Sequence, residues 1–516
     1  MSHIIIIKLT AKIDPSEVFY FLSKKNNFCF LDSSLSGNKY ANFSYICFEP
    51  DYLIKSSGGI NENINFLNSK SFKSESHPLE FLNEEINKNF YFNFLKNNTK
   101  PSCTFYDLPA GSFEKNAYIE NKDYPAFKGG FIGYLSYDLK KYIEILPDKV
   151  KDDLNLPFYN LLYFSKVFSY SHKENCWYYI ENRSSKYGAP SLKETMSIAK
   201  KADAFLLKQR NSMPDNGIIK KIVDKYLKLK FNSIKLDSNI SKKEYLSSVL
   251  AAKKYIHEGD IYQVNFTHRF SVRLPLNAAD FYYILRKTNP APFCAFIDFG
   301  SFKIASTSPE RLILIKKDYI ETRPIKGTRP RGKNKAQDLD LKKELKDSIK
   351  DRAELNMIVD LERNDLGKFC KYGSIKVKQH AVVEKYAKVF HTVSTVSGRI
   401  KKGTNFSEIV KAVFPGGSIT GAPKIRAMQI IDELEKNSRS IYTGSIGYIS
   451  VDGNVDLNIA IRTLIIKDEM FFYNTGGGIV EDSECDEEYE ETIQKGEALE
   501  KALKFFEYEN LRKTVI

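Results

Sequence analysis

The hydrophobic pattern of this 516-residue chain changes near residue 200. Before that point, short apolar runs alternate with turns rich in Asn, Ser and Lys, as in IIIIKL, NFCFLDSS, FSYICFEP, GGFIGYLSYDL, NLLYFSKVFSYS and CWYYIENR. Such runs are typical of β-strands. Beyond about residue 240, strand-like runs such as YQVNFTHRFSVRL and FCAFIDFG alternate with helical ones. Strands and helices mixed in this way predict an α+β fold with large antiparallel sheets.

The length is sufficient for two domains. We expect a mostly β N-terminal domain over residues 1–200, a connecting segment over 201–238 and a second domain over 239–510. The second domain opens with Ser241-Lys242-Lys243-Glu244, a capping box that predicts a helix ending at Gly259.

The composition excludes several classes of protein. No apolar run approaches the roughly 18 residues of a membrane-spanning helix. The four isoleucines at 4–7 are too short for a signal-peptide core, so we expect a cytoplasmic protein. The seven scattered cysteines, none in a CxxC pair, predict reduced thiols and neither a disulfide framework nor a zinc site.

The formal charge of +14 raises the question of nucleic-acid binding. However, the lysines are spread along the chain, and no RNA-recognition or helix-turn-helix signature accompanies them. A small polyanionic substrate that is steered electrostatically fits equally well. We therefore expect no nucleic-acid partner and no membrane partner.

The segment 324–332, PIKGTRPRG, places Lys326 in a glycine-bearing turn among Arg323, Arg329 and Arg331. Neighbouring positive charge disfavours the ammonium form, so such a lysine can act as a nucleophile near neutral pH. A basic surface loop, or a lysine that contacts an anionic substrate as a point charge, is the alternative interpretation.

Two acidic pairs recur at helical spacing. Asp351 and Glu354 lie three residues apart, as do Glu488 and Glu491, so each pair shares one face of a helix. Two such helices facing each other would form an all-oxygen site suited to Mg²⁺. Acidic residues that merely complement the dipole of a first helical turn are the simpler explanation for either pair alone.

Two glycine-rich segments are candidate anion-binding loops. The segment 414–424, FPGGSITGAPK, leads into a helix whose N-terminal N–H groups could hold a carboxylate. Gly476-Gly477-Gly478 indicates either a close backbone approach or a plain tight turn. Glu310 and His391 are single polar residues beside apolar runs, a setting in which structural roles are common.

These motifs together resemble those of the chorismate-utilising enzymes, which include the large subunits of anthranilate synthase and aminodeoxychorismate synthase and the isochorismate and salicylate synthases. The resemblance covers residues 240–505 through STSPERL, PIKGTRPRG, DRAELNMIVDLERNDLG, HTVSTVSG, FPGGSITGAPKIRAMQIIDELE, YTGSIGYIS, DLNIAIRT, GGGIV and EYEETIQKG, in unbroken order. It implies two large antiparallel sheets packed face to face and flanked by helices, with 239–510 as the chorismate-binding catalytic domain. The N-terminal segments resemble the family more loosely.

Two positions distinguish activities within the family. PIKGT around Lys326 resembles aminodeoxychorismate synthases, whereas anthranilate synthases usually carry PIAGT. Gln263 stands where the water-using members place a lysine base, which implies that ammonia is the incoming nucleophile. The resemblance thus implies Mg²⁺-dependent amination of chorismate to 4-amino-4-deoxychorismate, the first step of 4-aminobenzoate and folate synthesis, with anthranilate synthase as the alternative.

The resemblance also assigns roles to residues. Lys326 would form a covalent adduct at carbon 2 of chorismate, Glu310 would protonate the departing 4-hydroxyl, and His391 would complete the catalytic group. It implies that Mg²⁺ is held by Glu354, Glu488 and Glu491. It implies that chorismate is bound by Gln263, Gly327, Thr328, Ser418, Tyr442, Arg462, Gly478 and Lys495. Asp351 replaces the usual glutamate, and its shorter side chain would reach the metal only through water.

Partners follow from the same resemblance. No amidotransferase segment is recognisable, so ammonia is expected from a separate glutamine amidotransferase subunit, with free ammonium as a substitute in vitro. In the N-terminal domain, Asp32, Ser33, Ser44 and Tyr45 are the nearest matches to the tryptophan pocket of the family, so tryptophan is a candidate ligand. A catalytically inactive chorismate or tryptophan sensor is disfavoured, because a sensor has little need for Glu310 and Lys326.

Overall fold

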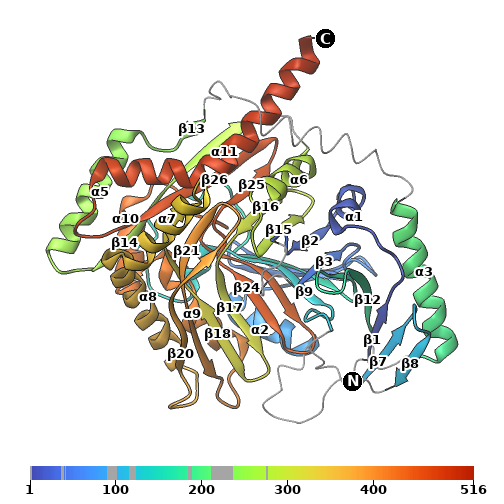
Figure 1. Cartoon of the computed structure of the whole chain (residues 1–516). Coiled ribbons are helices and arrows are strands. Elements are labelled where there is room, and N and C mark those ends of the chain that lie inside the picture. Colours follow the sequence, from blue (N-terminus) through green and yellow to red (C-terminus); the bar gives the residue numbers. More distant parts are fainter. Residues whose placement is uncertain are drawn as a thin grey trace.

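The computed structural model describes residues 3–515 apart from 36–39, 41, 90–101, 116–123, 184–188, 211–235 and 275–276. Two large β-sheets surrounded by helices dominate it (Figure 1). Every pair of described strands is antiparallel except β1 (His3–Lys8) and β7 (Ser102–Asp107), which are parallel. The structure confirms the predicted α+β class and its two sheets.

In the described part of the chain, one sheet has fourteen strands and the other has twelve. The first sheet has the strand order β13 (Asp237–Ser238), β14 (Gln263–Arg273), β26 (Met470–Ile479), β25 (Thr463–Lys467), β16 (Lys303–Ser308), β15 (Phe293–Asp298), β2 (Cys29–Asp32), β3 (Phe43–Cys47), β11 (Lys166–Ser171), β12 (Cys176–Arg183), β1, β7 and β8 (Ser112–Lys115), with β22 (Gly421–Ala422) beside β14. The second has the order β19 (Ile325–Pro330), β21 (Val389–Arg399), β18 (Tyr319–Arg323), β17 (Arg311–Lys316), β24 (Val455–Asn458), β23 (Ser445–Ser450), β9 (Gly130–Leu135), β10 (Tyr159–Phe164), β4 (Tyr52–Ser57), β5 (Ile60–Asn65) and β6 (Lys70–Ser74), with β20 (Lys376–Lys385) beside β21.

The four isoleucines of β1 explain why the sheets stack. Ile4 and Ile6 belong to the core that contains strands of both sheets, including Ile132 of β9. Ile5 and Ile7 point the other way, into a second core beneath the helices. A strand that is buried on both faces has a continuous apolar sequence, because neither set of alternating side chains meets water.

Both sheets contain strands from the two predicted domains. β2 pairs with β15 in the first sheet, and β9 pairs with β23 in the second. The boundaries predicted near residues 200 and 239 therefore do not separate the sheets, and the domain division stays a prediction. Most of the predicted connecting segment, residues 211–235, lies outside the described residues.

Helices cover the outer faces of the sheets. The second core contains residues of α1, α3, α6 and α11, which lie over the first sheet. None of the described helices is both long and apolar enough to cross a membrane. The helices of the described residues are α1 (Pro15–Leu22), α2 (Pro78–Asn89), α3 (Leu192–Arg210), α5 (Lys242–His257), α6 (Ala278–Thr288), α7 (Lys335–Asp347), α8 (Ile349–Gly367), α9 (Phe406–Val413), α10 (Lys424–Leu434) and α11 (Cys485–Val515), with short 3₁₀ turns η2 (Tyr137–Tyr142) and η4 (Gly417–Ile419).

One local prediction is confirmed, and one pair of alternatives is decided. The Ser241 hydroxyl accepts the Glu244 N–H, and the Glu244 carboxylate accepts the Ser241 N–H, so the predicted capping box is confirmed at the start of α5. Gly476-Gly477-Gly478 is not a tight turn, because all three residues lie within β26 and pair with β14. The three glycines allow neighbouring side chains to approach the strand closely.

Candidate functional site

Lys326 lies on β19, an edge strand of the second sheet, and its side chain approaches β26 of the first sheet. It is half-buried on β19, and its Nζ would be 3.5 Å from a Cβ placed on Gly478 of β26. No hydrogen bond or ion pair joins this ammonium to another residue in the described ranges. Burial lowers the pKa of Lys326 below its ordinary value, Lys495 adds to the shift, and Glu354 and Glu310 oppose it. A lysine held in this way has a larger fraction of neutral amine.

The predicted cause of this shift is wrong. Each neighbouring arginine is engaged elsewhere: Arg323 pairs with Glu384, Arg329 with Glu344 and Asp351, and Arg331 with Asp338. The amine is therefore destabilised as an ammonium mainly by loss of water. A loop rich in arginine does not by itself place those charges at the lysine.

Glu310 lies in the turn between β16 and β17 and is 4% exposed. The Ser418 hydroxyl donates to its Oε1 at 2.7 Å, and the Ile325 N–H donates to the same atom at 3.3 Å. Burial raises the pKa of Glu310 from 4.5 to about 7, although these two donors, Lys326 and Arg462 oppose the rise. The carboxyl can therefore hold a proton near neutral pH, as an acid catalyst requires.

Arg462 acts electrostatically on both Glu310 and His391. His391 is buried, its Nδ1 contacts the Thr328 hydroxyl at 2.9 Å, and its Nε2 has no hydrogen-bond partner among the described residues. Burial and then Arg462 lower the pKa of His391 to about 3, so the ring is neutral at physiological pH. The half-buried Arg462 has a φ of 50°, a backbone strain typical of functional positions.

Gly478 of β26 pairs with Asn265 of β14, and the side chain of Gln263, two residues before Asn265, lies over Gly478. Gln263 is 1% exposed, and neither Oε1 nor Nε2 has a hydrogen-bond partner within the described chain. A Cβ on Gly478 would lie 2.0 Å from Gln263 Nε2, so only glycine leaves room for this amide. A buried amide with both ends unsatisfied is costly unless a ligand completes it.

Three carboxylates gather near Lys326 from α8 and α11. A Cβ on Gly477 would lie 2.9 Å from Glu488 and 3.9 Å from Glu491, which explains the second glycine. Burial and repulsion from Asp351 and Glu491 raise the pKa of Glu354. Burial and repulsion from Glu491 likewise raise the pKa of Glu488, whereas for Glu491 the Lys495 ammonium outweighs burial and lowers it.

The chemical type of these donor atoms fits Mg²⁺. Hard carboxylate oxygens that repel one another are what this ion binds, together with water and substrate oxygens. As the side chains stand in the described residues, no group of three or more His, Cys, Asp and Glu residues is close enough to hold a metal ion. Glu491 instead pairs with Lys495 at 2.5 Å, and Glu488 accepts the Ser483 hydroxyl at 2.6 Å. Metal binding would require these two carboxylates to exchange partners.

The other residues predicted to bind substrate border the same region. Gly327 has a φ of 75°, and a Cβ there would lie 2.8 Å from the Asp351 carboxyl carbon, so glycine is required twice over. Lys495 donates to the Gly476 carbonyl at 3.0 Å. Tyr442 is buried. Burial, and then the charges of Glu488 and Glu491, raise the pKa of Tyr245, on which Tyr442 also acts. Thr328 is exposed and lies on β19.

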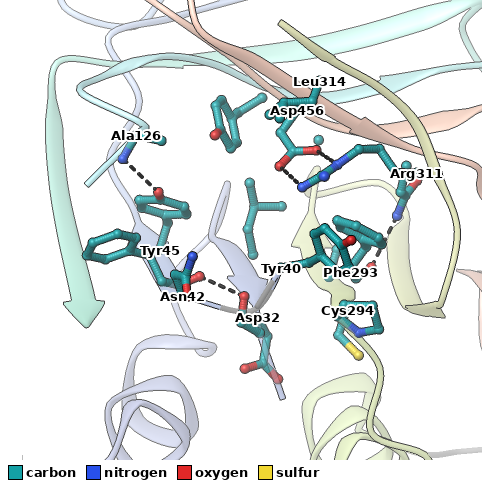
Figure 2. Close-up of a pocket in the computed structure, with 18 of the residues that line it drawn as sticks. Asp32, Tyr40, Asn42, Tyr45, Ala126, Phe293, Cys294, Arg311, Leu314 and Asp456 are labelled. Carbon is teal, nitrogen blue, oxygen red and sulfur yellow. Dashed lines mark hydrogen bonds and ion pairs between the residues drawn. The ribbon is translucent and has the colours of Figure 1, made fainter. Parts of the chain in front are cut away.

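A separate cavity of about 320 Å³ lies at the predicted tryptophan pocket (Figure 2). Asp32, Ser33 and Tyr45 line it, as predicted, whereas Ser44 is not in its lining. Its aromatic lining consists of Tyr40, Phe43, Tyr45, Tyr124, Phe293 and Tyr448. The lining also includes the charged residues Asp32, Arg311, Lys316, Glu321 and Asp456. The cavity is thus suited in size and lining to a ligand that has both a flat aromatic ring and charged groups.

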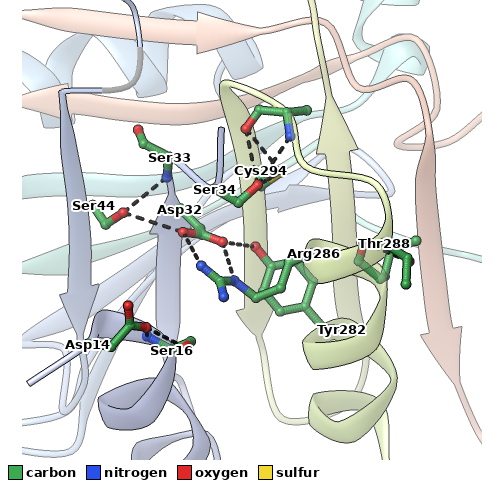
Figure 3. Close-up of polar contacts among 12 residues, drawn as sticks. Asp14, Ser16, Asp32, Ser33, Ser34, Ser44, Tyr282, Arg286, Thr288 and Cys294 are labelled. Atoms are coloured by element: carbon green, nitrogen blue, oxygen red, sulfur yellow. Dashed lines mark hydrogen bonds and ion pairs between the residues drawn. The ribbon is translucent and has the colours of Figure 1, made fainter. Parts of the chain in front are cut away.

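The floor of this cavity is a buried ion pair. Arg286 of α6 donates to the two oxygens of Asp32 at 2.6 and 3.0 Å, and the Tyr282 hydroxyl donates at 3.3 Å (Figure 3). Ser44 takes part in this network, because its hydroxyl contacts Asp32 and accepts the Ser33 N–H at 3.0 Å. Ser44 therefore contacts the lining residues Asp32 and Ser33 and does not itself line the cavity.

The sequence left several residues of these sites unrecognised. Lys350 of α8 acts electrostatically on all three carboxylates, and Glu362 of the same helix is buried near Glu310. Neither stands out, because each lies in a helix with many charges. Phe293 could have been found, since the preceding NPAP segment marks a rigid turn before a strand.

Comparisons with known proteins agree with this architecture. Residues 74–501 match the model of a family described as chorismate binding enzyme. The chain is 35% identical over 482 residues to anthranilate synthase component 1 of Acetivibrio thermocellus, covering 93% of this chain and 91% of that protein. It is 37% identical over 390 residues to aminodeoxychorismate synthase component 1 of Bacillus subtilis, covering 75% and 80%.

Solved structures show the same fold. Anthranilate synthase component I from Streptococcus pneumoniae superposes with a TM-score of 0.70 at 29% identity, over 89% of this chain and 92% of that one. The menaquinone-specific isochorismate synthase of Escherichia coli superposes with a TM-score of 0.64 at 17% identity, over 98% and 95%, and supports the fold alone. The chain is therefore a member of the chorismate-binding enzyme family, a family of chorismate-utilising enzymes.

Proposed function

We propose that this chain aminates chorismate to 4-amino-4-deoxychorismate with ammonia. The observation that carries the proposal is the half-buried Lys326 amine without a counter-ion, which faces the same site as the buried acid Glu310. A nucleophile and an acid in one water-poor site suit an allylic substitution better than ligand binding alone. The similarity to an aminodeoxychorismate synthase component over three quarters of the chain supports this choice.

The proposed reaction has two balanced substitutions. The neutral Lys326 amine forms a C–N bond at carbon 2 of chorismate, the two ring double bonds shift, and the C–O bond at carbon 4 breaks. Glu310 gives its proton to the departing hydroxyl, which leaves as water. Ammonia then forms a C–N bond at carbon 4, the double bonds shift back and the Lys326 amine departs. The proton released by the new ammonium group returns to Glu310.

Gln263 suits the second substitution. Its unsatisfied amide lies beside Gly478, next to the Lys326 nitrogen, and its oxygen can accept a hydrogen bond from ammonia. A glutamine cannot act as a base, and ammonia needs none in order to attack. His391 is neutral, so in this scheme it orients substrate as a hydrogen-bonding group and adds no positive charge.

Substrate binding is assigned to the cations and the carboxylates. Arg462 and Lys495 would bind the carboxylates of chorismate, and Arg462 can do so in bidentate fashion. Glu354, Glu488 and Glu491 would hold Mg²⁺, which when bound would neutralise the ring carboxylate and polarise the ring. Of these residues, Glu491 pairs with Lys495, and the charges of Glu354 and Glu491 act on Lys326 without an ion pair to it.

We expect the Glu491→Gln protein to lose Mg²⁺-dependent turnover, because one of three carboxylate ligands is removed. The measurement is the rate of product formation at increasing MgCl₂, with and without EDTA. The matched control is Glu490→Gln, which removes a more exposed carboxylate from the adjacent position of α11. Full wild-type activity in EDTA would contradict the metal assignment.

The ammonia is proposed to come from a separate glutamine amidotransferase subunit. Both relatives named above are called component 1 of their synthases, which is consistent with a second component. Purified chain should then use an ammonium salt but not glutamine. Activity with glutamine alone would contradict the need for a partner.

Anthranilate synthesis is the second candidate function. It is favoured by the anthranilate synthase component that matches 93% of this chain, a larger share than the aminodeoxychorismate synthase component. The deciding experiment is product analysis after incubation with chorismate, Mg²⁺ and an ammonium salt. A product that an added lyase converts to 4-aminobenzoate supports the first proposal, whereas anthranilate with pyruvate supports the second and overturns the role of Lys326.

The cavity lined by Asp32 and Tyr45 is proposed to bind tryptophan. We expect calorimetry to detect tryptophan binding to the wild-type chain and a loss of at least about tenfold in affinity for Tyr45→Ala, because a ring of the lining is removed. Tyr372→Ala, at a fully exposed tyrosine, is the control. Equal affinity in both variants would place any tryptophan elsewhere.

A further inference from the structure

Arg439 is a buried arginine to which the proposed reaction gives no task. It lies between α10 and β23 and is 2% exposed. Its Nε donates to Oε2 of the buried Glu435 at 3.0 Å, and its Nη2 donates to Oε1 at 2.6 Å, which is the bidentate pairing that a guanidinium and a carboxylate favour. Replacing a buried ion pair by apolar side chains is often neutral or stabilising, so stability alone does not account for this pair.

The other hydrogen bonds of Arg439 reach three further stretches of chain. Its Nη1 donates to the Ile419 carbonyl at 3.0 Å and to the Thr443 hydroxyl at 3.3 Å, and its Nη2 also donates to the Asn265 carbonyl at 2.6 Å. These acceptors belong to η4, to the turn before β23 and to β14. All five N–H groups of the guanidinium are thus engaged, and its planar fork holds the acceptors in fixed directions.

Two of these stretches carry residues of the candidate site. Ile419 follows Ser418, whose hydroxyl donates to Glu310 at 2.7 Å. Thr443 follows Tyr442 and has a φ of 60°, a backbone strain that persists only where surrounding contacts hold it. The guanidinium therefore contacts the chain one residue from the hydroxyl that supports the proposed acid, and one residue from a tyrosine assigned to chorismate binding.

The third stretch, β14, carries Gln263. Asn265, two residues further along this strand, pairs with Gly478 of β26. A Cβ on Gly478 would lie 2.0 Å from Gln263 Nε2 and 3.5 Å from Lys326 Nζ, so both side chains meet at this glycine. Because the guanidinium of Arg439 binds the Asn265 carbonyl, it holds the strand that brings the amide to the lysine amine.

The backbone alone does not join these stretches at the position where the site needs it. β22 pairs with β14, which fixes the chain on the far side of η4. Ser418 lies before β22 and outside that pairing. Arg439 extends the junction towards Ser418, because one guanidinium binds the carbonyls of both Ile419 and Asn265.

We propose that Arg439 is a positioning residue for the reaction, which holds the support of the acid Glu310 at a fixed distance from the Gln263 amide. This inference rests on the proposed function, in which Glu310 protonates the departing hydroxyl and ammonia attacks beside Gln263. Arg439 acts through these two residues and needs no contact with chorismate.

The test is the steady-state rate of chorismate consumption, with Mg²⁺ and an ammonium salt, by a double variant that carries Arg439→Met and Glu435→Gln. This variant leaves no unpaired buried charge, and the introduced amide oxygen can still accept the N–H and the hydroxyl of Thr267 that Glu435 accepts. We expect kcat to fall by about 10²-fold, the effect of misplacing reacting groups by about 1 Å. The turn at Tyr442 keeps its backbone hydrogen bonds, so the KM for chorismate should change by less than about threefold.

The matched control carries Lys128→Met and Asp452→Asn. It removes another buried ion pair, 3% and 7% exposed, which joins the segment before β9 to the turn between β23 and β24. The control should keep the wild-type kcat. A pair at Arg439 that only stabilised the fold would change the midpoint of thermal unfolding and leave kcat of the folded protein unaltered, and that result would overturn the inference. An equal loss of kcat in the control would overturn it too.

A second variant, Arg439→Lys, covers a double variant that does not fold. Its ammonium keeps a positive charge beside Glu435 but lacks the fork that reaches the Ile419 and Asn265 carbonyls, so we expect the same loss of kcat with little change in KM. A wild-type kcat in either folded variant would contradict the positioning role. Formation of anthranilate by the wild-type chain would instead overturn the proposed function, and the ratio of the two kcat values would still decide the role of Arg439.

Discussion

The Lys326→Ala protein is expected to lose amination of chorismate by more than about 10³-fold, on the scale seen when a catalytic nucleophile is removed from other enzymes. The reason is that the half-buried amine without a counter-ion is the only nucleophile that the proposed two-step route assigns to the site. The same change should abolish the mass increase that chorismate adds to the wild-type protein in the absence of ammonia. The measurements are lyase-coupled product formation and intact mass.

Two controls make this result specific. Lys343→Ala removes an exposed lysine from α7 and should leave both measurements unchanged. Lys326→Arg keeps the charge but not the nucleophile, and should bind chorismate without forming the adduct. Wild-type amination by Lys326→Ala would mean that ammonia attacks chorismate directly, and the proposal would then give way to direct substitution.

Much of the fold was predictable because it depends on local patterns. The isoleucine run of β1, the strand-like runs before residue 200 and the capping box at Ser241 each fix an element through its own residues. The order of strands was not predictable in this way. β2 pairs with β15 across about 260 residues, and no pattern within either strand states which partner it takes.

The candidate site shows the same difference between features set by local sequence and features set by the assembled fold. Helical spacing correctly put Glu354 on one helix and Glu488 and Glu491 on another, because the spacing is a property of a single element. The state of Lys326 could not be inferred from its neighbours in sequence, since Arg323, Arg329 and Arg331 all turn to other carboxylates. Its lowered pKa comes instead from burial between two sheets, which is a property of the assembled fold.

Glu362 is a second residue whose environment could not be predicted from its neighbours in sequence. In the segment DLERND it is one of four charged residues, and three of them find partners or solvent in a way typical of helices. Only the assembled fold shows that Glu362 is buried and that the charge of Glu310 acts on it. The resemblance to the family supplied roles for residues at known motifs, and it could say nothing of a position to which the motif assigns no role.

The Glu310→Gln protein is expected to form adduct and product about 10²- to 10⁴-fold more slowly, the range for loss of a general acid. The introduced amide oxygen would still accept the Ser418 hydroxyl and the Ile325 N–H, so the site should keep its shape while losing the proton. Wild-type activity should fall as pH rises through about 7, where Glu310 loses its proton, and the residual activity of the variant should lack that step. The measurement is the pH profile of adduct formation, for which Glu408→Gln on α9 is an exposed control.

Stability supplies an independent readout with a definite sign. Because burial raises the pKa of Glu310 from 4.5 to about 7, the folded chain binds a proton that the unfolded chain has lost between these values. The contribution of Glu310 to the free energy of unfolding therefore declines with rising pH across this window, whereas the lowered pKa of His391 makes a contribution of the opposite sign. Glu310→Gln removes the Glu310 contribution, so its free energy of unfolding should change less steeply downward, or more steeply upward, than that of the wild type between about pH 5 and pH 8 in denaturant titrations. Equal slopes for variant and wild type would mean that Glu310 is ionised throughout, and a group that is always ionised cannot be the acid of the reaction.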